Sequence, residues 1–264
     1  MAKTIIENIK EIVDIYLNGM PASAYNKFKR FMKEHKLKFT FDEISVDNLY
    51  RARVSEFELS KPEEMFHVPY NECYKVSNSR YSIAGYPSLY LGEDIDTCIN
   101  EIAKHYDLSK NVKLYISKIT VNKTPENYRT KQIKLKVIDA TKKESPLIEL
   151  FNELNKNITN DVENGKINFN KTYIIPQLFM QWIRNNIKEE EGTIKHIYGI
   201  KYKSEIGAGY NFVFPTNREK GKRFCPYLRR LFYVSKPIMI EKCEASNKIQ
   251  QLLDGIKMEE IPKI

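Results

Sequence analysis

Three side chains that could act on a single ligand lie close together in the sequence. Arg80 is followed by Tyr90, within a short apolar run, and then by Glu101, in a segment with helical spacing. A guanidinium binds anions, an aromatic ring packs against a flat group, and a carboxylate stabilises a positive charge that develops during bond cleavage. A nicotinamide dinucleotide offers all three targets: a pyrophosphate, a planar leaving group and a ribose that becomes cationic when its glycosidic bond breaks. The segment 79–102 is therefore the first candidate for a functional site.

Each of these side chains also has a purely structural interpretation. Glu101 could pair with Lys104 or His105 along the surface of a helix. Arg80 could point into solvent from a turn, and Tyr90 could belong to the core. The residues alone leave both interpretations open.

The elements around these residues would place the carboxylate at the edge of a cleft. The run 88–92 is typical of a short strand, and Asp94 or Asp96 can cap a helix that follows it. A stripe with helical spacing predicts the buried face of that helix, namely Ile95, Cys98, Ile99 and Ile102. Glu101 lies beside this stripe, so we expect it at the boundary between the core and solvent.

The N-terminal segment predicts a helical hairpin ahead of the main domain. Residues 4–19 repeat apolar side chains with the period of an amphipathic helix, the stretch 19–21 ends that helix, and residues 22–36 predict a second one. The chain is therefore divided into an N-terminal helical extension, 1–45, and a main domain, 46–264. The apolar side of the hairpin must pack on the main domain, on a second copy of the chain in a homo-oligomer, or on an inhibitor.

Strands and helices are intermixed in the main domain. Alternating segments predict strands at 49–54, 112–121, 133–138, 199–204, 210–214, 231–234 and 238–240, and helical spacing predicts helices at 146–155 and 176–186. The irregular segments 56–79 and 157–171 predict loops, the first of them over a site. Because the sequence lacks a regular alternation of strand and helix, the expected fold class is α+β.

The basic composition is compatible with two interpretations. The formal net charge is +9, and 42% of the residues are hydrophobic, which is enough for a globular core. The excess of lysine and arginine could be dispersed over the surface, or it could attract an anionic ligand, from nucleic acid down to a dinucleotide. Charge alone does not choose between them.

Several other classes of protein lack support in the sequence. The four cysteines are scattered and the four histidines have no ligand spacing, so we expect neither a disulfide framework nor a metal site. Glycine motifs of nucleotide-binding loops are missing. No apolar run is long enough to span a membrane, and Glu7 and Glu11 interrupt the place of a signal peptide, so the expected location is the cytoplasm.

Taken in order, several segments of the chain resemble the RES family, which is named for its arginine, glutamate and serine. The matching segments are 50–51, 79–92, 96–101, 137–140, 176–184, 197–204 and 210–214. The family usually has Gly-Arg-Phe/Trp/Met-Asn where this chain has Ser79-Arg-Tyr-Ser82. Two arginines follow Tyr50, and Arg51 fits the family pattern better than Arg53.

The resemblance implies a fold like that of ADP-ribosyltransferases, with two small sheets enclosing a cleft for NAD. Members are mostly bacterial toxins that consume NAD as a substrate, and many are paired with an antitoxin; no separate cofactor is implied. Carried over to this sequence, Glu101 would stabilise the cationic ribose and Arg51 would hold the pyrophosphate. Arg80, Tyr90 and Ser204 would contact other parts of NAD.

Ordinary roles remain open for these residues as well. Arg51 could form a surface ion pair and Ser204 could simply end a strand, while Asn211 is expected to be structural. Two functions follow from the sequence. The first is an enzyme that cleaves the nicotinamide–ribose bond of NAD, with an antitoxin or inhibitor as a partner; the second is a non-catalytic module that binds nucleic acid or protein through its basic surface.

Overall fold

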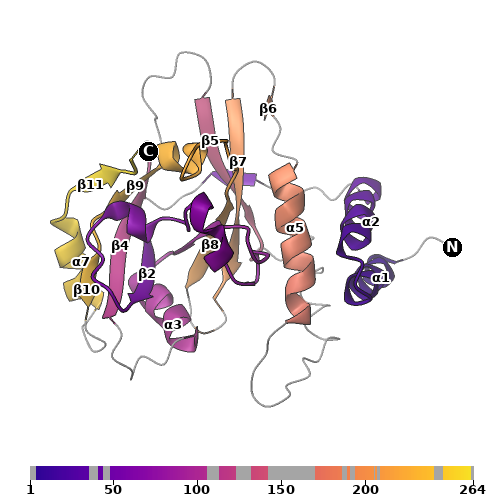
Figure 1. Ribbon diagram of the computed structural model, residues 1–264, viewed down its shortest axis with the longest axis horizontal. Coiled ribbons are helices and arrows are strands. Elements are labelled where there is room, and N and C mark those ends of the chain that lie inside the picture. The colour runs from indigo at the N-terminus through magenta and orange to yellow at the C-terminus, as the bar shows by residue number, and fades with distance from the viewer. Residues whose placement is uncertain are drawn as a thin grey trace.

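The computed structural model describes most of the chain around one large sheet (Figure 1). The described residues are 4–35, 41–43, 48–105, 113–122, 132–141, 170–185, 189–190, 194–204, 206, 209–240 and 246–262. The helix expected over 146–155 and most of the polar segment 157–171 lie outside them. Within the part described, no helix has the length and apolar character needed to cross a membrane.

The strands form one hydrogen-bonded path. Its order is β1 (Phe41–Glu43), β5 (Gln132–Asp139), β7 (Ile194–Lys203), β8 (Tyr210–Pro215), β3 (Ser88–Gly92), β2 (Asn48–Ser55), β4 (Lys113–Val121), β9 (Phe232–Ser235) and β11 (Met258–Glu260). Two short strands lie off this path: β10 (Ile238–Ile240) pairs with β4, and β6 (Glu189–Glu190) pairs with β7. The pair β5–β7 is parallel and the other pairs are antiparallel.

The sheet has a narrow joint between β2 and β3. These strands are paired at a single position, Tyr50 opposite Gly92, whereas β2 pairs with β4 over its whole length and β3 pairs with β8 over its whole length. We call this joint the seam. It divides the sheet into one half around β3, β8 and β7 and another around β2, β4 and β9. The α+β class is confirmed. Where the resemblance implied two small sheets, the structure has one sheet whose two halves meet at the seam.

The N-terminal hairpin packs on the same chain. Helices α1 (Ile5–Leu17) and α2 (Pro21–Glu34) are joined through Gly19, whose φ of 79° suits glycine. Their apolar sides meet α5 (Ile174–Asn185) in one buried cluster, which Figure 1 shows as three helices beside the sheet. The first of the three alternatives for the hairpin is therefore observed. Homo-oligomer formation remains a prediction, but this packing covers the apolar stripe on which it was based.

The other helices surround the sheet. They are α3 (Ile95–His105), α6 (Pro226–Leu231) and α7 (Ser246–Asp254), with short 3-10 turns at η1 (Pro62–Met65), η2 (Tyr70–Lys75) and η3 (Lys171–Tyr173). The segment 56–79, predicted as a loop over a site, contributes Met65, Phe66 and Tyr70 to the main core. The segment is irregular as predicted, since its only named elements are the two 3-10 turns η1 and η2; its position over a site remains a prediction.

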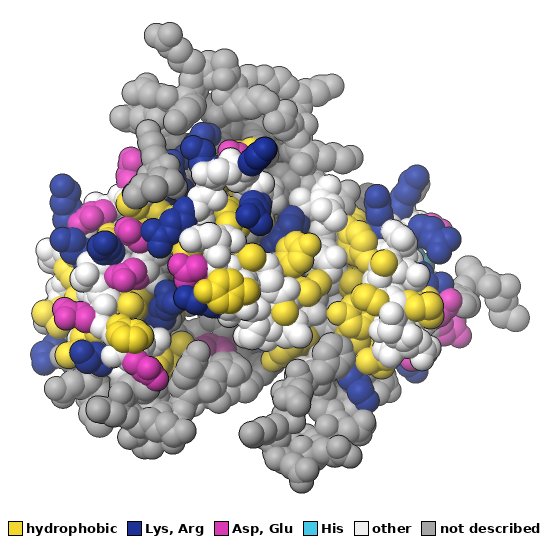
Figure 2. Space-filling view, viewed as in Figure 1, with side chains coloured by type: hydrophobic (Ala, Val, Ile, Leu, Met, Phe, Trp, Pro, Cys, Tyr) yellow, Lys and Arg dark blue, Asp and Glu magenta, His cyan; other side chains and the backbone are white. Residues whose placement is uncertain are grey.

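The basic residues are mixed with acidic ones on the face that Figure 2 shows. Lys and Arg side chains there alternate with Asp and Glu over the β2 and β4 region, rather than forming a uniform basic patch. On this face the distribution agrees with the interpretation of dispersed surface charge. A function must therefore be argued from particular side chains.

Candidate active site

Helix α3 positions Glu101. The Asp94 carboxylate caps the helix, since it accepts hydrogen bonds from the backbone N–H of Thr97 at 2.6 Å and from its hydroxyl at 2.9 Å. The predicted apolar stripe of the helix packs against β2, with Ile95 and Cys98 buried and Ile99 and Ile102 partly buried. Glu101 is half-buried at the edge of this stripe, which is where the sequence placed it.

Two glycines allow the strands to approach α3 closely. A Cβ atom at Gly209, before β8, would lie 1.9 Å from the Thr97 hydroxyl, and one at Gly92 would lie 2.5 Å from the Cys98 sulfur. Neither distance is compatible with a side chain. The start of α3 is therefore held directly against the β3–β8 pair, and this contact fixes the direction in which the helix extends toward Glu101.

The Glu101 carboxylate is held by two buried donors from neighbouring strands. Its Oε1 accepts a hydrogen bond from the Ser204 hydroxyl at 2.6 Å and another from the Asn211 side-chain amide at 2.8 Å. Ser204 and Asn211 are 4% and 6% exposed. The Ser204 oxygen also accepts from the N–H of Ile206 at 3.3 Å, which orients its own proton toward the carboxylate. Glu101 is thus an anchored carboxylate and not a freely rotating surface residue.

The ring of Tyr202 lies beside Arg80, on the strand pair that carries Asn211. The Arg80 guanidinium carbon lies 5.7 Å from the centroid of that ring, a cation–π distance. Tyr202 is opposite Asn211 in the β7–β8 register. Burial raises the pKa of Tyr202 well above its usual value, the negative charge of Glu101 raises it further, and Arg80 lowers it. A cation and a partly buried phenol therefore lie beside the strand pair that supplies a donor to Glu101.

Arg51 lies at the seam with an incomplete set of partners. Its Nη1 donates to the backbone carbonyl of Tyr90 at 3.1 Å, and its buried Nε has no hydrogen-bond partner. Burial, and then the charge of Arg53, lower the pKa of Arg51 to about 10. A buried cation with an unused donor has a strong preference for an anion. Arg53 instead donates to the carbonyl of Glu64, so Arg51 is the arginine beside the other candidate residues.

Tyr90 holds the turn that carries Arg80. Its hydroxyl contacts the hydroxyls of Ser79 at 2.7 Å and Ser82 at 3.0 Å, and it accepts from the N–H of Tyr81 at 3.1 Å. From the opposite side, Nε2 of Gln177 in α5 donates to the carbonyls of Ser79 and Ser82, at 2.8 and 3.2 Å. Tyr90 therefore fixes the position of Arg80, and direct contact between Tyr90 and NAD remains a prediction.

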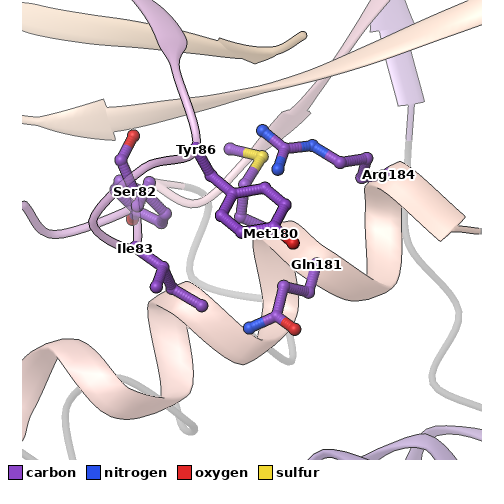
Figure 3. Close-up of a pocket in the computed structure, with 7 residues that line it drawn as sticks. Ser82, Ile83, Tyr86, Met180, Gln181 and Arg184 are labelled. Atoms are coloured by element: carbon purple, nitrogen blue, oxygen red, sulfur yellow. The ribbon is translucent and has the colours of Figure 1, made fainter. Parts of the chain in front are cut away.

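A small pocket lies on the α5 side of this turn (Figure 3). It is lined by Tyr81, Ser82, Ile83, Tyr86, Met180, Gln181 and Arg184. The Arg184 guanidinium lies 5.1 Å from the centroid of the Tyr86 ring and donates to the carbonyl of Pro87 at 3.0 Å. These contacts attach the 81–87 segment to α5. The pocket shares Tyr81 and Ser82 with the turn that carries Arg80, but it does not include Glu101, Ser204 or Arg51.

The structure brings some of the predicted residues together directly and others only through neighbours. Glu101 and Ser204 are in contact, Arg51 donates to the backbone carbonyl of Tyr90, and Arg80 contacts Tyr202, which is opposite Asn211 in the β7–β8 register. Within the described residues, no group of three or more His, Cys, Asp or Glu side chains is arranged to hold a metal ion. The arrangement can bind anionic groups at its arginines and stabilise a positive charge at Glu101.

The sequence interpretation missed the contributions of two residues. Asn211, expected to be structural, is the second donor to Glu101. Tyr202 was not selected, although it lies near the end of β7, two residues before Ser204, which directly follows that strand. The spacing of two residues between Tyr202 and Ser204 was the signal available in the sequence.

Comparisons with known proteins give distant similarities. No family model matches the sequence. A protein of Bacillus subtilis (strain 168) named Putative toxin YopC is 23% identical, over 90% of this chain and 59% of that protein. This chain thus spans about three fifths of the length of that relative. A chain in the crystal structure of the M. tuberculosis MbcT–MbcA toxin–antitoxin complex aligns with a TM-score of 0.42 and 12% identity, over 81% of this chain and 92% of that chain.

Proposed function

We propose that this chain is an NAD-consuming, toxin-like enzyme that cleaves the bond between nicotinamide and ribose. The observation that carries the proposal is the Glu101 carboxylate, which two buried donors hold in one orientation. Breaking this bond passes through an oxocarbenium-like state whose positive charge is absent from the substrate. A carboxylate that is already oriented beside the ribose stabilises that state selectively, and this selectivity accelerates the reaction.

The arginines suit the rest of the substrate. Arg51 is a partly desolvated cation with a buried Nε that lacks a partner, so it would gain most from a pyrophosphate oxygen. Arg80 lies over Tyr202 and is held there by the Tyr90-bonded turn, which suits a second phosphate or ribose contact. In this proposal NAD occupies the region of the seam, as in an ADP-ribosyltransferase-like fold, with Arg51 on one half of the sheet and Ser204 and Asn211 on the other.

The toxin part of the proposal is supported by the sequence similarity to Putative toxin YopC, which extends over 90% of this chain. An enzyme that depletes NAD would harm the cell that produces the enzyme unless its activity is inhibited. An antitoxin or inhibitor protein therefore belongs to the same proposal. A non-catalytic binding module explains the site less well. Such a module has no use for an anchored carboxylate between basic side chains, because the carboxylate would repel the phosphates of a nucleic acid.

The test is to incubate the purified chain with NAD and to separate the products by chromatography. Release of nicotinamide that depends on added phosphate, with formation of a phosphorylated ADP-ribose, would identify phosphorolysis. Release without phosphate would identify hydrolysis when free ADP-ribose accumulates, and transfer when the ADP-ribose remains on a protein. If NAD stays intact both with and without phosphate, the proposed function is wrong.

A further inference from the structure

The seam determines how the two halves of the sheet, which both contribute residues to the proposed site, are placed relative to each other. The Tyr50–Gly92 pair joins the two halves of the sheet there, and the bond from Arg51 to the carbonyl of Tyr90 crosses at the same place. Arg51 belongs to the β2 half, while the donors to Glu101 belong to β8 and the end of β7. Any shift of one half against the other would change how these groups face a common ligand.

Tyr50 is held from two directions at this seam. Its backbone carbonyl accepts a hydrogen bond from the thiol of Cys98 at 3.2 Å, and Cys98 lies three residues before Glu101 on α3. Its hydroxyl donates to Oε1 of Gln250 in α7 at 2.6 Å. Tyr50 thus links the helix that carries the carboxylate, the strand that carries Arg51 and the C-terminal helix.

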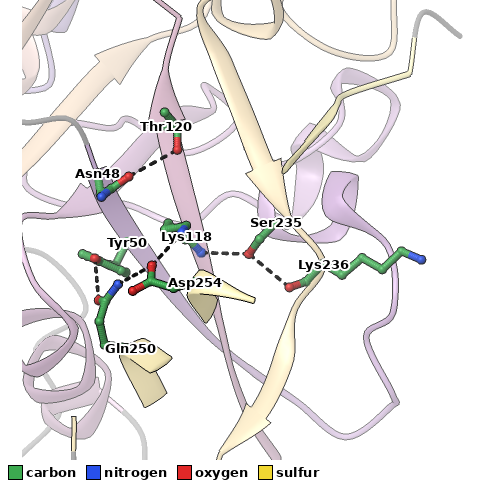
Figure 4. Close-up of polar contacts among 8 residues, drawn as sticks. All are labelled: Asn48, Tyr50, Lys118, Thr120, Ser235, Lys236, Gln250 and Asp254. Atoms are coloured by element: carbon green, nitrogen blue, oxygen red, sulfur yellow. Dashed lines mark hydrogen bonds and ion pairs between the residues drawn. The ribbon is translucent and has the colours of Figure 1, made fainter. Parts of the chain in front are cut away.

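Helix α7, which accepts the hydrogen bond from Tyr50, is itself bonded to β4 and packed in the core (Figure 4). Nε2 of Gln250 donates to Oδ1 of Asp254 at 2.8 Å, and the same oxygen pairs with Nζ of Lys118 in β4, also at 2.8 Å. The Lys118 side chain is 11% exposed and the Asp254 side chain is 56% exposed, so solvent screens this pair from one side. Ile249 and Leu253 of α7 are completely buried in the same apolar cluster as Tyr50.

The hydroxyl of Tyr50 is not needed to fill space. The side chain is 7% exposed and packs in an apolar cluster, where a phenylalanine ring would fit equally well. What the hydroxyl adds is a directional bond between the seam and α7. We propose that Tyr50 is a positioning residue through which α7 sets the relative placement of Arg51 and the Glu101 group across the seam. This inference rests on the proposed function, because its consequence is the fit of NAD.

The test compares Tyr50→Phe with the wild-type chain in steady-state NAD cleavage. Losing one buried hydrogen bond that aligns the site should raise KM for NAD about 2- to 10-fold, with a smaller fall in kcat. Thr120→Val is the matched control. It also removes a side-chain bond between β2 and β4, from Thr120 to Asn48 at 3.4 Å, but this bond does not involve α7. The control should leave both constants unchanged.

A second variant removes the acceptor instead of the donor. Gln250→Leu also removes the bond from Gln250 to Asp254, so it should raise KM at least as much as Tyr50→Phe. The double variant should be no worse than Gln250→Leu alone, because that change has already broken the link to Tyr50. Fully additive effects would contradict the proposal. So would an unchanged KM in both single variants.

Hydrogen exchange supplies a readout that does not depend on NAD. The amides around Tyr50 and Gly92 should exchange faster in Tyr50→Phe, while those of α1 and α2 stay as in the wild type. Unchanged exchange at the seam would overturn the proposed link. Faster exchange with an unchanged KM would show that α7 stabilises the seam without positioning the substrate, and would also overturn it. If the wild-type chain leaves NAD intact, the proposed function fails, and the exchange data still decide whether α7 holds the seam.

Discussion

The two hydrogen bonds to Glu101 should be worth a measurable part of catalysis, and they should not be independent. Ser204→Ala and Asn211→Ala each remove one donor from the same carboxylate oxygen and leave the other in place. With one donor left, the carboxylate keeps its charge but gains freedom to rotate. We therefore expect kcat to fall in both variants, while KM for NAD changes little.

The size of the effect follows from the type of bond. A hydrogen bond to a charged group contributes about 1.5–3 kcal/mol. If this is expressed fully in the transition state, kcat falls by about 10- to 150-fold for each variant. The double variant should fall by less than the product of the two single effects, because the second bond orients a carboxylate that the first loss has already released.

The assay is nicotinamide release at saturating NAD, with thermal unfolding measured on the same samples. Thr216→Val is the control, since Thr216 directly follows β8 and its buried hydroxyl donates to the carbonyl of Pro87 at 2.8 Å, away from Glu101. It should lower stability without lowering kcat. A Ser204→Ala variant with wild-type kcat, or a double variant whose loss equals the product of the singles, would refute the reasoning.

Three further predictions concern other parts of the molecule. Arg51→Ala should weaken NAD binding and kcat/KM together, and Arg51→Lys should restore only part of both, because an ammonium lacks the planar fork; full rescue in calorimetry and kinetics would count against a bidentate contact. Burial lowers the pKa of His67 to about 4, so on acidification the unfolded chain takes up a proton at this residue before the folded chain does. The free energy of unfolding, measured in urea, should therefore fall by roughly 3 kcal/mol between about pH 6.5 and pH 4. His67→Gln should make the free energy of unfolding less dependent on pH over this range. A chain beginning near Phe39 lacks α1 and α2 and uncovers α5, so it should lose solubility and NAD turnover; equal solubility, mass and rate would show that the hairpin is dispensable.

Local features of the sequence predicted the elements that carry the site. The stripe and the cap that define α3 lie within one helix, so their spacing was sufficient to place Glu101 at the edge of the buried face. The strands β2, β3 and β8 are short runs rich in apolar and aromatic residues, and the hairpin α1–α2 has a strong helical period. In contrast, α6 and α7 are short, and α7 is polar apart from Ile249, Leu252 and Leu253, so neither gave a signal above that of a loop.

Contacts between distant residues were harder to predict. Ser204 and Asn211 lie 103 and 110 residues from Glu101, and no periodicity connects them. The order of motifs pointed to Ser204, but the role of Asn211 depends on the β7–β8 register, which only the folded sheet fixes. The hydroxyl of Tyr90 illustrates the same limit, since its three contacts depend on how the 79–82 turn folds back over β3.

The most direct test of the central claim is the turnover of Glu101→Gln beside that of Asp96→Asn. Glutamine keeps the size of the side chain and can still accept from Ser204, but it removes the charge that faces the developing cation. We predict a loss on the order of 10²–10³ in nicotinamide release, with NAD still bound. Asp96, exposed on the same helix and bonded to Ser246, should tolerate the equivalent change with no loss. Near wild-type release by Glu101→Gln would contradict the account.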